Sequence, residues 1–208
     1  MSFSEILTRY RDETSRVNSY IDLAFQQDAR GDFLRSEDEI EFLVTSAFLK
    51  QFLAWEQFLE SSFIAYMTGL NGLDGTCPLR YVEPVDEGHA NKILIGTQRY
   101  VDWANHEIVK RIASLYFERG EPYNTAINSV SRELSDCKII RNASAHNSST
   151  TQTAFEAVVS RVLSDDTTNM SISKFLTAIS PEDTSNTVMQ QFQLKLDITA
   201  ENIAWNRT

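Results

Sequence analysis

Glycine, proline and cysteine are scarce in this chain of 208 residues, which contains seven, four and two of them respectively. A chain with few glycines and prolines has few obligatory turns, so the composition favours long helices. The two cysteines, Cys77 and Cys137, form no CxxC pair and lie far apart in the sequence. We therefore expect reduced thiols, with no disulfide framework, no metal site and no cofactor.

Signals for membranes and for secretion are also lacking. No apolar run reaches the length needed to cross a bilayer. Residues 1–5 do not resemble the start of a secretory signal peptide. Together these absences predict a cytoplasmic protein without a membrane partner.

Basic residues are fewer than acidic ones, and the formal net charge is −10. Affinity for nucleic acids comes largely from Lys and Arg side chains that neutralise phosphates. A broad nucleic-acid-binding surface is therefore not expected. A small local phosphate site is compatible with this charge, and its contact with nucleic acid should be short or supported by a partner.

Apolar residues recur at steps of three and four, which is the spacing of amphipathic helices. The first stripe predicts a helix over residues 3–29, with residues 30–32 as its end. A capping box at Ser36 and Glu39 begins a long aromatic helix that stops at Gly69, and we expect it to be the central helix of a bundle. Further helices are expected over residues 86–95, 101–118, 125–134, 137–147, 154–163, 172–179 and 181–205.

Polar segments separate these predicted helices. Residues 70–85 and 147–153 are expected to be loops, and Ser135 and Asp136 are expected to cap the helix that follows them. Pro181, followed by two acidic residues, has the pattern of a first helical turn. Because no strand pattern and no internal repeat is visible, the predicted fold is all-α, an antiparallel helical bundle with a C-terminal helical extension.

One short segment combines a fixed cation with a group that titrates near neutral pH. Arg141 can hold a phosphate bidentately, and His146 can take or give a proton. Five residues on a helix turn the chain through roughly 140°, so the two side chains cannot form a tight pair on one face. They could line two sides of a groove or meet their counterparts across a two-fold axis, and Asn142 could orient the His or hold a phosphate oxygen. A solvated helix end, where cations favour the helix dipole, is the alternative.

The six residues from Arg141 to His146 resemble the Arg-x4–6-His signature of the HEPN superfamily, which consists of all-helical domains of toxin, phage-defence and RNA-processing systems. In that family the residue after the Arg is often Asn, Asp or His, and it is Asn142 here; an apolar lead-in precedes the motif. The run Trp55-Glu56-Gln57-Phe58-Leu59-Glu60 is similar to HEPN groups of the RiboL-PSP type.

The resemblance covers roughly residues 1–165, which would form a HEPN-like bundle, and it leaves residues 166–208 as a C-terminal helical extension packed on the same domain. It implies a metal-independent endoribonuclease that leaves 2′,3′-cyclic phosphate and 5′-hydroxyl ends. His146 would be the general acid or base, Arg141 would bind the scissile phosphate, and Asn142 would belong to the same catalytic set.

The partners that the resemblance implies are an RNA substrate, a second copy of the chain with the motif at the interface, and an antitoxin or regulatory protein. Some HEPN toxins carry a Tyr two residues after the His, where a partner enzyme adds a nucleotide. Ser148 occupies that position here, which puts that route of neutralisation in doubt. The alternative function is a non-catalytic HEPN-type module that binds a protein or a nucleotide, and the acidic charge favours it. A purely structural bundle in a larger complex is a third hypothesis, with residues 154–205 as the docking element.

Other polar candidates are weaker. His89 and His106 each have an acidic residue one helical turn away, but neither has a third partner at metal-ligand spacing. Glu56 and Glu60 could orient Arg141, although a solvated stripe is the simpler interpretation. Ser144 lacks the context of a nucleophile elbow, and the chain has no glycine-rich phosphate loop.

Overall fold

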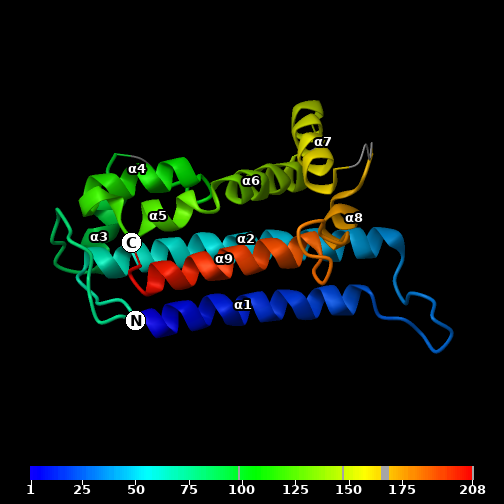
Figure 1. Cartoon of the computed structure of the whole chain (residues 1–208), viewed down its shortest axis with the longest axis horizontal. Helices are drawn as coiled ribbons and strands as arrows, with labels where there is room; N and C mark the ends of the chain where they lie inside the picture. Colours follow the sequence, from blue (N-terminus) through cyan, green and yellow to red (C-terminus); the bar gives the residue numbers. More distant parts are fainter. Residues whose placement is uncertain (98, 147, 165–168, 208) are drawn as a thin grey trace. The chain divides into compact units, whose positions relative to one another are not determined.

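The protein is described by a computed structural model that covers residues 1–97, 99–146, 148–164 and 169–207. Helices account for nearly all of its regular structure, and the β-bridges in this described part are isolated ones rather than strands (Figure 1). The fold is therefore all-α, as predicted. The helices are α1 (Phe3–Ala24), α2 (Glu37–Met67), α3 (Glu87–Ile95), α4 (His106–Tyr116), η1 (Glu118–Gly120), α5 (Tyr123–Asn128), α6 (Ser131–Ala145), α7 (Ser149–Leu163), α8 (Ile172–Thr177) and α9 (Val188–Ala204).

The chain divides into two compact units. Unit 1 comprises Met1–Arg11, Ala54–Ser135 and Lys195–Thr208, and unit 2 comprises Asp12–Leu53 and Asp136–Leu194. Helices α1, α2, α6 and α9 contribute residues to both units. The domain boundary predicted between residues 165 and 166 lies outside the described residues. No helix in the described part of the chain has the length and apolar character required to span a membrane.

In unit 1, the beginning of α1 packs against the end of α2. The ring of Phe3 lies 4.2 Å from the ring of Tyr66, and the ring of Tyr10 lies 5.5 Å from that of Phe58, both measured between centroids. Because the later residue of α1 contacts the earlier residue of α2, the two segments run antiparallel. This confirms the antiparallel arrangement that was expected of the bundle for this pair of helices.

A cluster of aromatic rings forms the core of unit 1. Phe63, at the centre of the cluster, lies 5.5 Å from Trp103, 5.0 Å from Phe117 and 4.8 Å from Tyr123 between ring centroids. Helices α4, η1 and α5, which carry or flank these partners, form the green cluster of short helices in Figure 1. The Tyr123 hydroxyl donates a hydrogen bond to Ser62 Oγ, and burial raises the pKa of Tyr123. This core is apolar, with its few hydroxyls paired.

Unit 2 is held together by polar as well as apolar contacts. The side chain of Gln193 on α9 donates to Asn18 on α1 at 2.9 Å. Phe155 on α7 packs edge-on against Phe175 on α8, with ring centroids 5.6 Å apart. Glu41 on α2 accepts hydrogen bonds from α8, as described below.

Caps explain where several helices begin and end. The predicted box at α2 is present, because Ser36 N–H donates to Glu39 Oε2 and Glu39 N–H donates to Ser36 Oγ. Helix α1 ends at Ala24, five residues before the predicted end. The shorter helix is explained by Asp28, whose carboxylate accepts from the N–H groups of Arg30 and Asp32 and closes a turn at Gly31, where φ is +89°.

The largest error of the sequence interpretation concerns α6. Ser135 and Asp136 were expected to cap a helix at residues 137–147, but α6 runs from Ser131 to Ala145 without a break. Ser135 Oγ donates back to the Ser131 carbonyl, a bond that is available inside a helix, and Asp136 forms an ion pair with α7. The expected helix over residues 125–134 is therefore divided between α5 and α6.

Two other boundaries were wrong because better caps lie elsewhere. Helix α7 begins at Ser149, inside the tract predicted as a loop, because Ser148 and Thr151 form a capping box. Helix α9 begins at Val188, where Thr187 and Gln190 exchange the same two bonds. The segment after Pro181 is consequently a loop and not the first turn of a helix.

Candidate functional site

The Arg141–His146 motif lies at the C-terminal end of α6, in unit 2. Arg141 and Asn142 are half-buried within the last turns of the helix, and His146 is exposed directly after it. The His146 N–H still donates to the Asn142 carbonyl at 2.9 Å, so helical spacing extends to His146. The two functional side chains therefore leave the helix axis in different directions, as the five-residue spacing predicts.

Asn142 is oriented by its neighbour in the motif. Arg141 Nη1 donates to Asn142 Oδ1 at 3.2 Å. The amide of Asn142 therefore acts on the guanidinium of Arg141, and no bond joins it to the His146 ring within the described residues. The remaining guanidinium N–H groups of Arg141 can donate to an anion, because this side chain has five donors.

His146 is bound through its backbone and not through its ring. Its carbonyl accepts from Thr151 Oγ1 at 2.7 Å and from Ser148 N–H at 3.2 Å, both of which belong to the start of α7. Within the part of the chain that the structure describes, the imidazole has neither a hydrogen bond nor an ion pair. An exposed imidazole on a backbone held by two hydrogen bonds can exchange protons with a bound molecule.

An ion pair joins the two helices on either side of His146. Asp136 on α6 accepts a hydrogen bond from Arg161 on α7. The Asp136 side chain is only 6% exposed, whereas that of Arg161 is 40% exposed. Because the helices are linked both at this pair and at the cap of α7, the turn that carries His146 has support from both sides.

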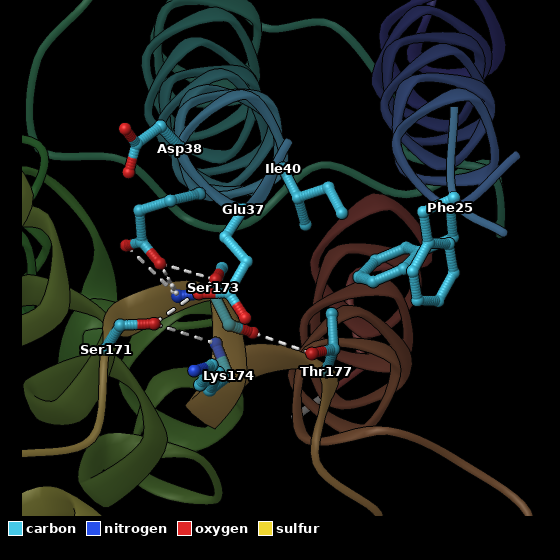
Figure 2. Close-up of a pocket in the computed structure, with 10 residues that line it drawn as sticks. Phe25, Glu37, Asp38, Ile40, Ser171, Ser173, Lys174 and Thr177 are labelled. Carbon is cyan, nitrogen blue, oxygen red and sulfur yellow. Dashed lines mark hydrogen bonds between the residues drawn. The ribbon is translucent and has the colours of Figure 1, made fainter. Parts of the chain in front are cut away.

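A second polar site, which the sequence gave no means to find, lies between α2 and α8 (Figure 2). The Glu41 carboxylate accepts hydrogen bonds from the backbone N–H and the hydroxyl of Ser173 and from Thr45 Oγ1. Burial acts to raise the pKa of the Glu41 carboxyl, but hydrogen bonds from Ser171, Ser173 and Thr45 outweigh burial and lower the pKa below its usual range. Glu41 is therefore a carboxylate at neutral pH.

This carboxylate borders a cavity of about 330 Å³ in unit 2. Side chains from the segment after α1, from the start of α2 and from α8 and its N-cap line it, as Figure 2 shows. No member of the Arg141–His146 motif is among its lining residues, so the cavity and the motif are separate sites. The lining residues are Phe25, Phe33, Glu37, Asp38, Ile40, Glu41, Ser171, Ser173, Lys174 and Thr177.

The weaker candidates have local structural roles. The His89 ring accepts a hydrogen bond from Val85 N–H at 3.3 Å, and His106 Nε2 lies 3.1 Å from the carboxylate of Glu107. Ser144 Oγ donates to the Ile140 carbonyl at 2.8 Å, within its own helix. Among the described residues, no group of three or more His, Cys, Asp or Glu side chains could hold a metal ion.

Glu56 and Glu60, the acidic residues of the Trp55–Glu60 run, are half-buried on the part of α2 that belongs to unit 1. Arg141 belongs to unit 2, so their suggested role in orienting Arg141 stays a prediction. Trp55 itself is 1% exposed and packs in the core of unit 1, where its ring lies 5.8 Å from that of Phe58.

We compared the chain with protein-family models, with curated proteins and with solved structures, and none of them matches it. A function for this protein therefore has to be argued from its own residues and from the resemblance of residues 141–146 to the HEPN signature.

Proposed function

We propose that the protein is a metal-independent endoribonuclease of a defence, toxin–antitoxin or RNA-processing system. The observation that carries this proposal is the exposed imidazole of His146, which forms no hydrogen bond or ion pair among the described residues. It follows by five residues an Arg141 guanidinium whose orientation is supported by Asn142. A cation that binds phosphate and a group that transfers protons are the two functions that RNA cleavage without a metal requires.

In the proposed reaction, the RNA 2′-oxygen attacks the adjacent phosphorus and the bond to the 5′-oxygen breaks. His146 accepts the proton of the 2′-hydroxyl, and an acid returns a proton to the 5′-oxygen that leaves. Arg141 donates hydrogen bonds to the phosphate oxygens, which carry the additional negative charge in the transition state. The products are a 2′,3′-cyclic phosphate and a 5′-hydroxyl.

A second copy of the chain would supply the acid. Because Arg141 and His146 leave their helix in different directions, one motif does not present both groups to the same side. Two motifs facing each other across a two-fold axis would place an Arg from one copy opposite a His from the other. The proposed active form is therefore a homodimer, and an antitoxin or regulatory protein would act by covering or separating these motifs.

The competing function is a non-catalytic helical module that binds a protein or nucleotide partner, and the net charge of −10 favours it. Fewer basic side chains mean weaker contact with the RNA backbone. The two functions differ in one respect that can be measured, which is whether loss of the His146 ring abolishes turnover.

The test is cleavage of labelled single-stranded RNA in EDTA by the wild-type protein and by His146→Ala. We expect the variant to lose activity by about 10²- to 10⁴-fold, because general acid–base catalysis contributes on that order. Analysis of the product ends should find cyclic phosphates. Arg141→Lys keeps the charge but loses bidentate binding, so it should also reduce cleavage.

His89→Ala is the matched control, because His89 is likewise exposed but lies outside the motif, on α3 in unit 1. It should retain wild-type cleavage. Cleavage that survives in His146→Ala, or that stops on addition of EDTA, would contradict the proposal. Equal inactivity of wild type and His146→Ala would favour the non-catalytic module.

A further inference from the structure

We propose that the cavity between α2, α8 and the segment that follows α1 is a binding site for a small organic cation, an ammonium or guanidinium group carried on an apolar body. The proposal is independent of ribonuclease activity, because the lining residues and the Arg141–His146 motif have no member in common. It rests on the size of the cavity, on the charges around it and on its aromatic side.

The size fits a small molecule. The cavity measures about 330 Å³, and pockets for small ligands in proteins begin at about 300 Å³. Phe25, Phe33 and Ile40 contribute apolar side chains to its lining, and the other lining side chains are polar. An amphipathic ligand would match both kinds of side chain.

The charge selects a cation. Three carboxylates, those of Glu37, Asp38 and Glu41, line the cavity, and Lys174 is the one basic side chain among the lining residues described. Glu41 is ionised at neutral pH, as its hydrogen bonds require. Within the described structure Lys174 forms no ion pair with Glu37 or Asp38, so these carboxylates remain available to a ligand.

The arrangement favours an organic cation over a metal ion. The three carboxylates do not form a group that could coordinate one ion, since no such group exists among the described residues. Phe25 and Phe33 form an edge-on pair with centroids 5.9 Å apart, at the side of the cavity. The faces of aromatic rings attract ammonium and guanidinium groups, and their edges and faces pack against apolar ligand atoms.

Benzylamine is a suitable probe, because it carries an ammonium group at neutral pH on a small apolar body. Titration of the ¹⁵N-labelled full chain, followed by amide NMR, should give saturable shifts at Ser173, Lys174 and Thr177. Benzyl alcohol and benzoate, which have a similar shape but no positive charge, should bind at least about tenfold more weakly. Equal shifts with benzyl alcohol would show that charge has no role and would overturn the proposal.

Substitution of the carboxylates tests whether they bind the positive charge of the ligand. The double substitution Glu37→Gln with Asp38→Asn should weaken benzylamine binding by about three- to thirtyfold, because each exposed ion pair contributes about 0.3–1 kcal/mol. Asp22→Asn is the matched control, since Asp22 is an exposed carboxylate on α1 of the same unit and does not line the cavity. It should leave the affinity unchanged.

Phe33→Ala tests the aromatic side separately. The Phe33 side chain is 52% exposed, so its removal should not prevent folding. We expect weaker binding of benzylamine with an unchanged NMR spectrum elsewhere. Unchanged affinity in both the double variant and Phe33→Ala would overturn the assignment of this cavity as the site, even if benzylamine binds the chain.

Discussion

Unit 1 and unit 2 both contain half-buried polar bonds, such as that between Glu133 and Lys195 in unit 1, but they differ in the extent of their aromatic contacts. In unit 1 aromatic rings from α1, α2, α4 and α5 and the segments beside them form one cluster around Phe63. In unit 2 aromatic contacts are accompanied by buried or half-buried polar bonds, such as Asp136 with Arg161 and Glu41 with Ser173. Apolar burial is favourable wherever it occurs, whereas a buried polar group stabilises only while its partner is present.

The largest aromatic core and the candidate functional sites lie in different units. Both candidate sites, the Arg141–His146 motif and the cavity beside Glu41, belong to unit 2. Polar groups that are already partly solvated can be rearranged around a ligand at lower cost than rings in a close-packed core. We therefore interpret unit 1 as the rigid core and unit 2 as the part that contains both candidate sites.

The largest effect should come from the centre of the unit 1 core. Phe63 is fully buried, and Phe63→Ala leaves a cavity among Trp103, Phe117 and Tyr123. We expect the free energy of unfolding to fall by about 3–5 kcal/mol, as measured by urea denaturation followed by circular dichroism.

Phe42→Ala is the control for this substitution, because Phe42 lies on the same helix but is 70% exposed. Its cost should stay within about 0.5 kcal/mol. A similar cost for the two variants would show that the aromatic cluster does not distinguish unit 1 in the way proposed.

An intermediate effect should come from the ion pair of unit 2, in which the Asp136 carboxylate is buried. Asp136→Asn removes the charge that balances Arg161 while leaving the volume unchanged, and we expect it to cost about 1–3 kcal/mol. If the proposed nuclease activity exists, it should also fall, because the pair supports the turn that carries His146. The measurements are urea denaturation and the RNA cleavage assay.

An exposed ion pair gives the comparison for Asp136. Asp197 binds Arg11 in unit 1, and its side chain is 34% exposed. Asp197→Asn should therefore cost less than about 1 kcal/mol and leave cleavage intact. Equally small effects of both substitutions would show that unit 2 does not depend on the pair between Asp136 and Arg161.

The all-α fold and the ends of helices with clear capping residues could be predicted from the sequence, because these signals are local. The capping box at Ser36 and Glu39 and the stop near Gly69 set the bounds of α2 within two residues. The N-terminus of α3 was predicted equally well, since Asp86 caps it by accepting from His89 N–H. Apolar spacing and caps act within a few residues, so a single sequence contains them.

The predicted ends of helices were wrong where two local sequence signals favoured different structures. Ser135 and Asp136 have the composition of a cap, yet a Ser can bond to its own helix and an Asp can pair with a distant Arg. Which option is taken depends on α7, whose Arg161 is 25 residues away. The start of α9 was a different kind of error, because Thr187 and Gln190 carry the signature of a capping box and could have been recognised.

The two candidate sites also differ in whether their residues are close together in the sequence. Arg141, Asn142 and His146 could be proposed as a site from the sequence because they lie together at one helix end. Glu41 and Ser173 are 132 residues apart, and no spacing rule relates them. The cavity beside them depends on tertiary packing and could not have been predicted from local patterns.

The smallest loss of stability is expected for substitution of Glu41. Its dependence on pH distinguishes a contribution of the carboxylate charge from one of packing. The pKa of the Glu41 carboxyl is lowered in the folded protein because hydrogen bonds from Ser171, Ser173 and Thr45 outweigh its burial. A carboxyl of this kind stabilises the fold at pH values above its unfolded pKa of about 4.3, and the contribution is lost as the pH falls through the lower, folded pKa. Glu41→Gln should therefore cost on the order of 1 kcal/mol at neutral pH.

That cost should shrink as the pH falls from the unfolded pKa through the lower, folded pKa, because the wild-type carboxyl is then protonated as well. Urea denaturation of wild type and Glu41→Gln across this range measures the change. Asp22→Asn, at an exposed carboxylate of the same unit, should stay close to wild type throughout. A cost for Glu41→Gln that is constant with pH would mean that shape rather than charge holds α8 to α2, and the charge of Glu41 would not be among the contacts on which unit 2 depends.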